Sequence, residues 1–179
     1  MDRLQATWRP AVPRGDRPLV ISTETGTTLR IDEGGLEGRA LLRYRIRHGD
    51  VETLTFSLPA GAESLAIDGT AVRSFSRRGD QVLVELTRPM RGAVALDIRF
   101  RAPAPEGDDA RSAPLPVAGD GAGWLTVLRG DEALVVPEPS GAMEPVASRA
   151  LPRWARGLAD GETVATYRAT RHPSLDYRV

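Results

Sequence analysis

The chain of 179 residues contains no cysteine. Disulfides, thiol nucleophiles and thiolate metal sites are therefore excluded. A chain without cysteine suits either a reducing cytosol or a cysteine-poor bacterial exterior. The compartment stays open on this ground, with the periplasm or cell surface slightly favoured.

The chain also lacks lysine, and it lacks net charge, because 24 arginines balance 24 aspartates and glutamates. A neutral chain has no global field that would concentrate nucleic acid, anionic lipid or acidic substrates. We therefore expect no nucleic-acid partner, and any polyanion would have to bind a local patch. Arginine holds bidentate ion pairs better than lysine does, which favours structured ion pairs on the surface.

Long apolar runs are absent too. The sequence has no stretch of about 18 apolar residues, the length that a membrane-spanning helix needs. Residues 1–18 also lack the apolar centre of a signal peptide. We expect no direct insertion into a membrane.

The feature that the chain does have is a dense β pattern between Gly38 and Arg101. Leu42, Tyr44 and Ile46 alternate with arginines, as expected for a strand with one buried and one solvated face. Similar short apolar series follow at residues 54–58, 65–67, around Val72, 82–86 and 94–100, and strand-like segments precede them at 18–23 and 27–32. The pairs Asp68-Gly69 and Gly79-Asp80 lie where tight reversals are needed. This spacing predicts an all-β fold, an antiparallel β-sandwich with a C-terminal β-rich extension and one short helix.

The pattern divides the chain into four parts. Residues 1–17 form an extended lead-in, 18–101 the sandwich core, 102–123 a Pro/Gly-rich loop or linker, and 124–179 a β-rich extension packed on the core. The composition of the linker predicts that it buries little apolar surface.

Within the extension, residues 124–128 and 132–137 resemble a hairpin around Arg129-Gly130-Asp131. This tripeptide also matches the integrin-recognition signal, but a hairpin turn accounts for it. A short helix is expected over Leu151–Ala159, with Pro152 near its start. Alternation over 163–170 and 175–179 predicts further strands, the last of which would offer an exposed edge for self-association.

No motif for catalysis, metal binding or nucleotide binding stands out. The two histidines, His48 and His172, have no second strong metal ligand at helical spacing. No Gly-x-Ser-x-Gly elbow frames a serine. The glycine-rich run from Gly34 to Gly38 lacks the Lys-Ser/Thr pair of a phosphate loop and reads as a hairpin connection. We expect no catalytic residue, no metal site and no cofactor.

Two candidate recognition surfaces remain. Arg43, Arg45 and Arg47 on one strand would lie beside Arg99 and Arg101 if the two strands pair, and five guanidinium groups could grip a polyanion or an acidic partner. The alternative is that Glu52, Glu85 and Asp97 on adjacent strands neutralise them.

The second surface is aromatic. Trp8, Trp124 and Trp154 could form a platform on which sugar rings stack, although packing in the core or extension is the more ordinary role of tryptophan.

The run from Tyr44 to Phe100 contains Leu-Thr-Phe-Ser-Leu-Pro, then Leu-Ala-Ile-Asp-Gly, then Gly-Asp-Gln-Val-Leu-Val-Glu-Leu. In this order it resembles the N-terminal β-domain of zinc aminopeptidases and related bacterial extracytoplasmic β-sandwich modules. Gly141-Ala142-Met143-Glu144-Pro145 also looks like the substrate-binding Gly-x-Met-Glu-Asn motif of those peptidases, with Pro145 in place of asparagine.

The His-Glu-x-x-His zinc helix of that family is missing from the sequence, and with it the metal-activated water of a peptidase. The resemblance therefore implies a non-catalytic scaffold domain whose catalytic part, if any, lies outside these residues. It leaves Met143 and Glu144 as loop residues.

These observations predict a non-enzymatic structural or protein-interaction module, part of a larger bacterial protein. A protein partner or a second copy would bind a sheet face or the loops at one end. A carbohydrate-binding module that takes a polysaccharide, and an accessory domain of a hydrolase or peptidase, are the alternatives.

Overall fold

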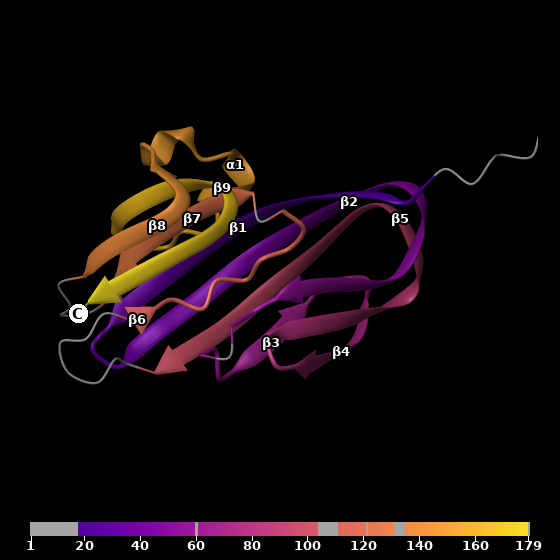
Figure 1. Cartoon of the computed structure of the whole chain (residues 1–179), viewed down its shortest axis with the longest axis horizontal. Coiled ribbons are helices and arrows are strands. Elements are labelled where there is room, and N and C mark those ends of the chain that lie inside the picture. The colour runs from indigo at the N-terminus through magenta and orange to yellow at the C-terminus, as the bar shows by residue number, and fades with distance from the viewer. Residues whose placement is uncertain (1–17, 60, 104–110, 121, 131–134, 179) are drawn as a thin grey trace, which may run out of the picture.

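The computed structural model describes residues 18–59, 61–103, 111–120, 122–130 and 135–178. The predicted lead-in at 1–17, with Trp8, lies outside these residues. The strands are β1 (Val20–Asp32), β2 (Gly35–Ser57), β3 (Leu65–Asp68), β4 (Val72–Arg78), β5 (Gln81–Pro103), β6 (Arg111–Ser112), β7 (Gly123–Arg129), β8 (Val136–Pro145) and β9 (Thr163–Arg178). The helices are the 3₁₀ turn η1 (Ser148–Ala150) and the short α1 (Arg153–Arg156). The prediction of an all-β fold with one short helix is confirmed (Figure 1).

The strands follow the order β3-β5-β2-β1-β7-β9-β6, with β4 beside β5 and β8 beside β9. All of these pairs are antiparallel except β1 and β7, which run parallel. Parallel neighbours need a long crossover, and the chain between β1 and β7 provides one through β2 to β6. The sheet is therefore mixed, where the sequence pattern led us to expect antiparallel pairs throughout.

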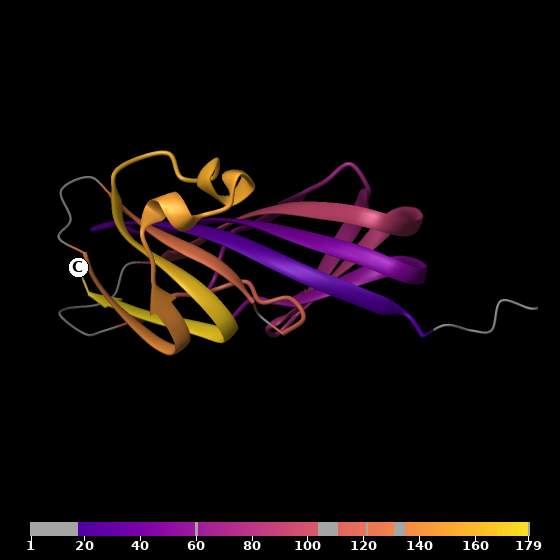
Figure 2. The ribbon, with the colours of Figure 1, turned by 90° about the horizontal axis from the view of Figure 1, so that it is seen from above.

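Of the six short strands expected between 38 and 101, two are present as β3 and β4, and the two long strands β2 and β5 take the place of the other four. β2 and β5 contain 23 residues each and pair with each other along most of their length. Their register shifts between Ile46 and Val51, and near this point Gly49 (φ 77°) and Gly92 (φ 83°) adopt left-handed conformations that favour glycine. The pair turns back on itself there, so each strand contributes one half to each of two layers (Figures 1 and 2).

Side-chain contacts connect the segments on either side of the bend. The Tyr44 hydroxyl donates a hydrogen bond to the carbonyl of Thr55 at 3.1 Å, joining the two halves of β2. Arg91 Nε lies 3.0 Å from the Asp50 carboxylate, which joins β5 to β2 at the bend itself. These contacts connect the two halves of β2 and connect the two strands at the bend.

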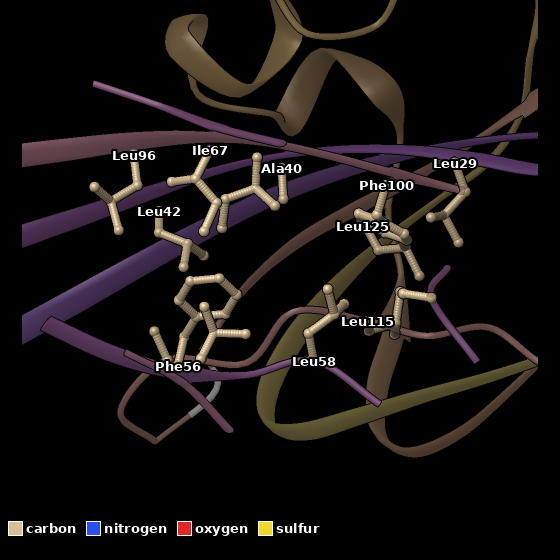
Figure 3. Close-up of a cluster of buried hydrophobic side chains, with 14 of the residues drawn as sticks. Leu29, Ala40, Leu42, Phe56, Leu58, Ile67, Leu96, Phe100, Leu115 and Leu125 are labelled. Atoms are coloured by element: carbon tan, nitrogen blue, oxygen red, sulfur yellow. The ribbon is translucent and has the colours of Figure 1, made fainter. Parts of the chain in front are cut away.

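The hydrophobic core fills the space between the layers. Leu42 and Leu96 come from one half of the bent pair, Phe56 comes from the other half, and Leu58 follows β2; all four are buried. Figure 3 shows Leu42 above the Phe56 ring, with Leu115 beside Leu58. One core is thus built from strands far apart in the sequence.

The segment 102–123 corrects the sequence-based prediction. Ala113, Leu115 and Ala118 are buried in the core, and Ser57 and Val117 exchange backbone hydrogen bonds at 2.8 Å. The prediction that this segment buries little apolar surface is wrong for residues 113–118, because its small and proline residues pack between strands without needing a ladder of their own.

Two predictions in the extension are also wrong. β7 pairs with β1 and β9, and β8 pairs with β9, so in the described residues no hairpin joins β7 to β8 around Arg129-Gly130, and Asp131 lies outside those residues. The C-terminal end of β9 is not an exposed edge, because residues 174–178 pair with β8 and residues 176–177 pair with β6. Leu175 and Tyr177 point into the core there.

The helix is shorter than expected but lies where the sequence placed it. Pro152 is its N-cap, and Leu151, Ala155 and Leu158 are buried against the sheet. In the described part of the chain, no helix has the length and apolar character needed to cross a bilayer.

We predict that Gly38→Ala strongly destabilises the protein. Gly38 lies opposite Phe100 in the β2–β5 register, and a Cβ added to Gly38 would overlap the Phe100 ring. Since core overpacking typically costs 1–3 kcal/mol, we expect a loss of about 2 kcal/mol in the free energy of unfolding, measured by urea denaturation. Gly61→Ala is the matched control, because a Cβ at Gly61 meets nothing within 4 Å. Equal stability of the two variants would contradict this packing.

A second prediction concerns Tyr44. Burial raises the pKa of its phenol, so ionisation is easier in the unfolded chain than in the native protein. Its contribution to stability is present below the unfolded pKa of about 10 and is lost as the pH rises above that value. Tyr44→Phe should cost about 1 kcal/mol at neutral pH through the lost hydrogen bond, yet reduce the alkaline decline in the free energy of unfolding. Unfolding titrations from about pH 7 to about pH 11 would show it; parallel profiles for the two proteins would refute the assignment.

Candidate functional site

One face of the larger layer is polar and points away from the core. This outer face is formed by the residues of β1, β2, β3 and β5 that alternate with the buried ones, and it carries Glu24, Arg30, Glu37, Arg39, Arg43, Arg45, Asp68, Asp97, Arg99 and Arg101. The α1 segment covers the part of this face over β1 and β7, where Thr28 and Thr126 are buried. The remainder of the face is the candidate recognition surface.

The five arginines of the predicted cluster share this layer but do not lie side by side. β2 and β5 do pair, as required, with Arg99 opposite Arg39 and Arg101 opposite Glu37. Arg43 and Arg45 lie opposite Ala95 and Ala93, several residues further along both strands. The register thus separates Arg99 and Arg101 from Arg43, Arg45 and Arg47.

Most of these arginines are paired with carboxylates. Asp97 receives two hydrogen bonds from Arg39, at 2.6 and 3.1 Å, and these raise the pKa of the Arg39 guanidinium. Arg101 Nη2 lies 2.6 Å from Glu37 Oε1, and Arg43 Nη1 lies 3.3 Å from Glu24 Oε2.

Within the described residues, none of the acids expected to neutralise the cluster, Glu52, Glu85 and Asp97, forms an ion pair with one of its arginines. Asp97 pairs with an arginine outside the predicted cluster, whereas Glu85 accepts a hydrogen bond from Ser74 at 2.8 Å. Exposed pairs of this kind each stabilise a fold by less than about 1 kcal/mol, so they act mainly to neutralise the surface.

Two of the predicted tryptophans do lie near each other. Trp124 on β7 is the register partner of Gly26 on β1, and a Cβ added to Gly26 would lie 2.6 Å from Trp154 Cζ3. The Arg43 guanidinium lies over the Trp154 ring at 4.9 Å, and the Arg168 guanidinium lies over Trp124 at 5.8 Å. Since a cation already covers one face of each ring, less ring surface is left for a sugar to stack on.

The other residues that the sequence singled out for a site lie in turns and strands. Gly34 belongs to the turn between β1 and β2, where its N–H donates to the Asp32 carboxylate at 2.9 Å. Met143 and Glu144 lie in β8, not in a loop; Met143 packs against the core and Glu144 is exposed opposite Arg168. His48 is half-buried in β2, and the side chain of His172 lies outside the described residues. Within those residues, no three His, Asp or Glu side chains gather as a metal site would require.

The structure also contains a cavity that sequence reasoning missed. It measures about 490 Å³ and is lined by Thr28, Arg30, Glu37, Gly38, Arg39, Ser64, Leu65, Ala66, Arg99, Phe100, Arg101, Leu128, Leu158 and Asp160. These residues come from five strands and from the segments before β3 and after α1. Arg39 continues the alternating arginine series of β2 and could have been suspected, but Arg30 and Asp160 join the site only through the register of the sheet.

Comparison with known proteins gives matches to solved structures. No family model and no curated protein matches the sequence. The structure is similar to that of an M1 zinc metallopeptidase mutant from Deinococcus radiodurans bound to a Tyr-Ser-Ala substrate, with a TM-score of 0.52 and 15% identity over 88% of this chain. It is also similar to a two-domain M1 zinc metallopeptidase mutant bound to L-tryptophan, with a TM-score of 0.54 and 14% identity over 88% of this chain.

In both cases the chain spans 42% of the length of the metallopeptidase. At this level of identity the likeness establishes the architecture alone. The chain adopts the fold of part of an M1 zinc metallopeptidase, in agreement with the resemblance of its sequence to a peptidase β-domain.

Proposed function

We propose that this protein is a non-catalytic accessory β-domain that works together with a zinc peptidase catalytic region. The observation that supports the proposal is the fold likeness, which extends over 88% of this chain but only 42% of the metallopeptidase chains. In this proposal the remainder of such an enzyme, which this chain does not supply, carries the zinc and the chemistry.

The sequence supports the non-catalytic part of the proposal. A zinc peptidase needs two or three nitrogen ligands near a carboxylate that acts as general base. This chain has two histidines and no His-Glu-x-x-His helix. The segment that looks like a peptidase substrate motif, Gly141–Pro145, belongs to strand β8 and pairs with β9.

The architecture suits a rigid scaffold. Long strands are shared by both layers, and the outer face carries charges that are largely paired within the domain. A partner that docks on such a face meets few charges that need new counterions. We propose that the catalytic region is the protein partner of this module, in the same polypeptide or in a separate one.

The proposal can be tested by immunoprecipitation. An antibody raised against the purified 179-residue chain would be used on lysate of the source cells, and the precipitate assayed with aminoacyl-p-nitroanilides before and after chelation with 1,10-phenanthroline. We expect chelator-sensitive peptidase activity in the precipitate. The purified chain itself should show no hydrolysis above the blank, with or without added zinc.

The control is the same precipitation after the antibody has been saturated with purified chain, which should remove the activity. A precipitate that contains the protein but no peptidase activity would overturn the accessory role. Hydrolysis by the purified chain that persists through repurification and is lost on unfolding would overturn the non-catalytic role.

A further inference from the structure

The cavity on the outer face lies where three structural units meet. Its floor is formed by β1 and β2, with Arg30, Glu37 and Arg39. One wall comes from β3, β5 and the residues just before β3, and the other from Leu128, Leu158 and Asp160. A volume of about 490 Å³ is within the range of small-ligand sites. The proposed accessory function assigns no ligand to this cavity.

The register of the sheet concentrates positive charge in the cavity. Glu37 lies between Arg30 and Arg101 in one row across the strands, and Arg39 lies directly opposite Arg99 in the next row. Like charges placed opposite each other are unfavourable unless something compensates them. Four arginines and only two acids, Glu37 and Asp160, line the cavity.

The four arginines are compensated unequally. Arg39 is held by two hydrogen bonds to Asp97, and Arg101 by a close pair with Glu37. Arg99 has only a 3.5 Å contact with Asp68, and the two side chains are 61% and 66% exposed. The Arg30 guanidinium donates a hydrogen bond to the backbone carbonyl of Asp160, and a carbonyl carries no net charge. Arg30 takes part in none of the ion pairs among the described residues.

The spare donors therefore belong to Arg30 on β1 and Arg99 on β5, the two strands that flank β2. A guanidinium offers five N–H donors in a planar fork that matches a carboxylate. Glu37 and Asp160 would repel a phosphate dianion more strongly than a carboxylate, which carries a single charge. Leu128 and Leu158 add an apolar wall against which an aliphatic chain can pack.

We propose that this cavity binds a carboxylate-bearing ligand, with Arg30 and Arg99 as its anchors. The carboxylate can belong to an acidic peptide or to a free small acid, because both present the same group to the guanidinium forks.

The proposal is tested by ¹H–¹⁵N correlation spectra of the full chain. The probes are N-acetyl-leucyl-glutamate, glutarate, the neutral diamide of the dipeptide and inorganic phosphate. We expect N-acetyl-leucyl-glutamate or glutarate to cause saturable shifts of the amides in residues 28–39, 64–66, 99–101 and 158–160, with a dissociation constant of about 1 mM. Tighter binding of the dipeptide than of glutarate would identify a peptide as the source of the carboxylate. Equal binding of the two would identify a free small acid.

The anchors are tested by substitution. Arg30→Gln combined with Arg99→Gln should weaken binding roughly tenfold or more, because each charged hydrogen bond contributes strongly to affinity. Arg45→Gln is the matched control, since Arg45 is exposed on the same face but outside the cavity, and it should change affinity less than about twofold. Should the double variant lose its native spectrum, Arg99→Gln alone, which alters an exposed side chain, should still weaken binding about threefold.

Three results would overturn the proposal. They are the absence of saturable shifts with either carboxylate, equal shifts with the neutral diamide, and an Arg45→Gln loss as large as that of the anchor variants. Tighter binding of phosphate than of both carboxylates at the same amides would overturn the choice of ligand class.

Discussion

The bend in the β2–β5 pair is the constraint on which the rest of the structure depends. Two straight strands of 23 residues would extend over roughly 75 Å and leave one apolar face in water. Turning both strands at the same point brings Phe56 to face Leu42, so that one pair of strands contributes to both walls of the core. Gly49 and Gly92 allow the turn, and the hydrogen bond from Tyr44 to Thr55 holds it.

Once the bend is set, the period of two along each strand decides what the surface can do. Residues that alternate with the core positions must face outward, and the pairing of β1, β2 and β5 then determines which outward charges become neighbours. This is why Arg39 finds Asp97 and Arg101 finds Glu37, while Arg99 and Arg30 keep donors to spare. The cavity results from the same register together with the partial cover that the α1 segment provides.

The sequence predicts the elements whose signals are local. Alternation identifies the strands around Leu42 and Val94, the Gly79-Asp80 turn does join β4 to β5, and Pro152 does begin a short helix. Features that depend on contacts between distant segments were not predicted. Alternation continues on both sides of the bend, so the sequence of one bent strand predicts two short strands. The parallel β1–β7 pair and the burial of Leu115 depend on the path of the crossover, which the local sequence does not indicate. The five arginines of the predicted cluster are separated for the same reason, because the pattern indicates that β2 and β5 pair but does not give the register of the pair.

The chemistry of this fold can be separated from its architecture. The fold of this domain is held by the bent β2–β5 pair and its core, and within the described residues no cluster of His, Asp or Glu side chains takes part in it as a metal site would. The outer-face cavity is equally independent of catalysis, because its arginines are placed by strand register and lie on the face that the core does not use. Together the two proposals give the domain a scaffold role and a point of contact for acidic groups, both built from the same sheet.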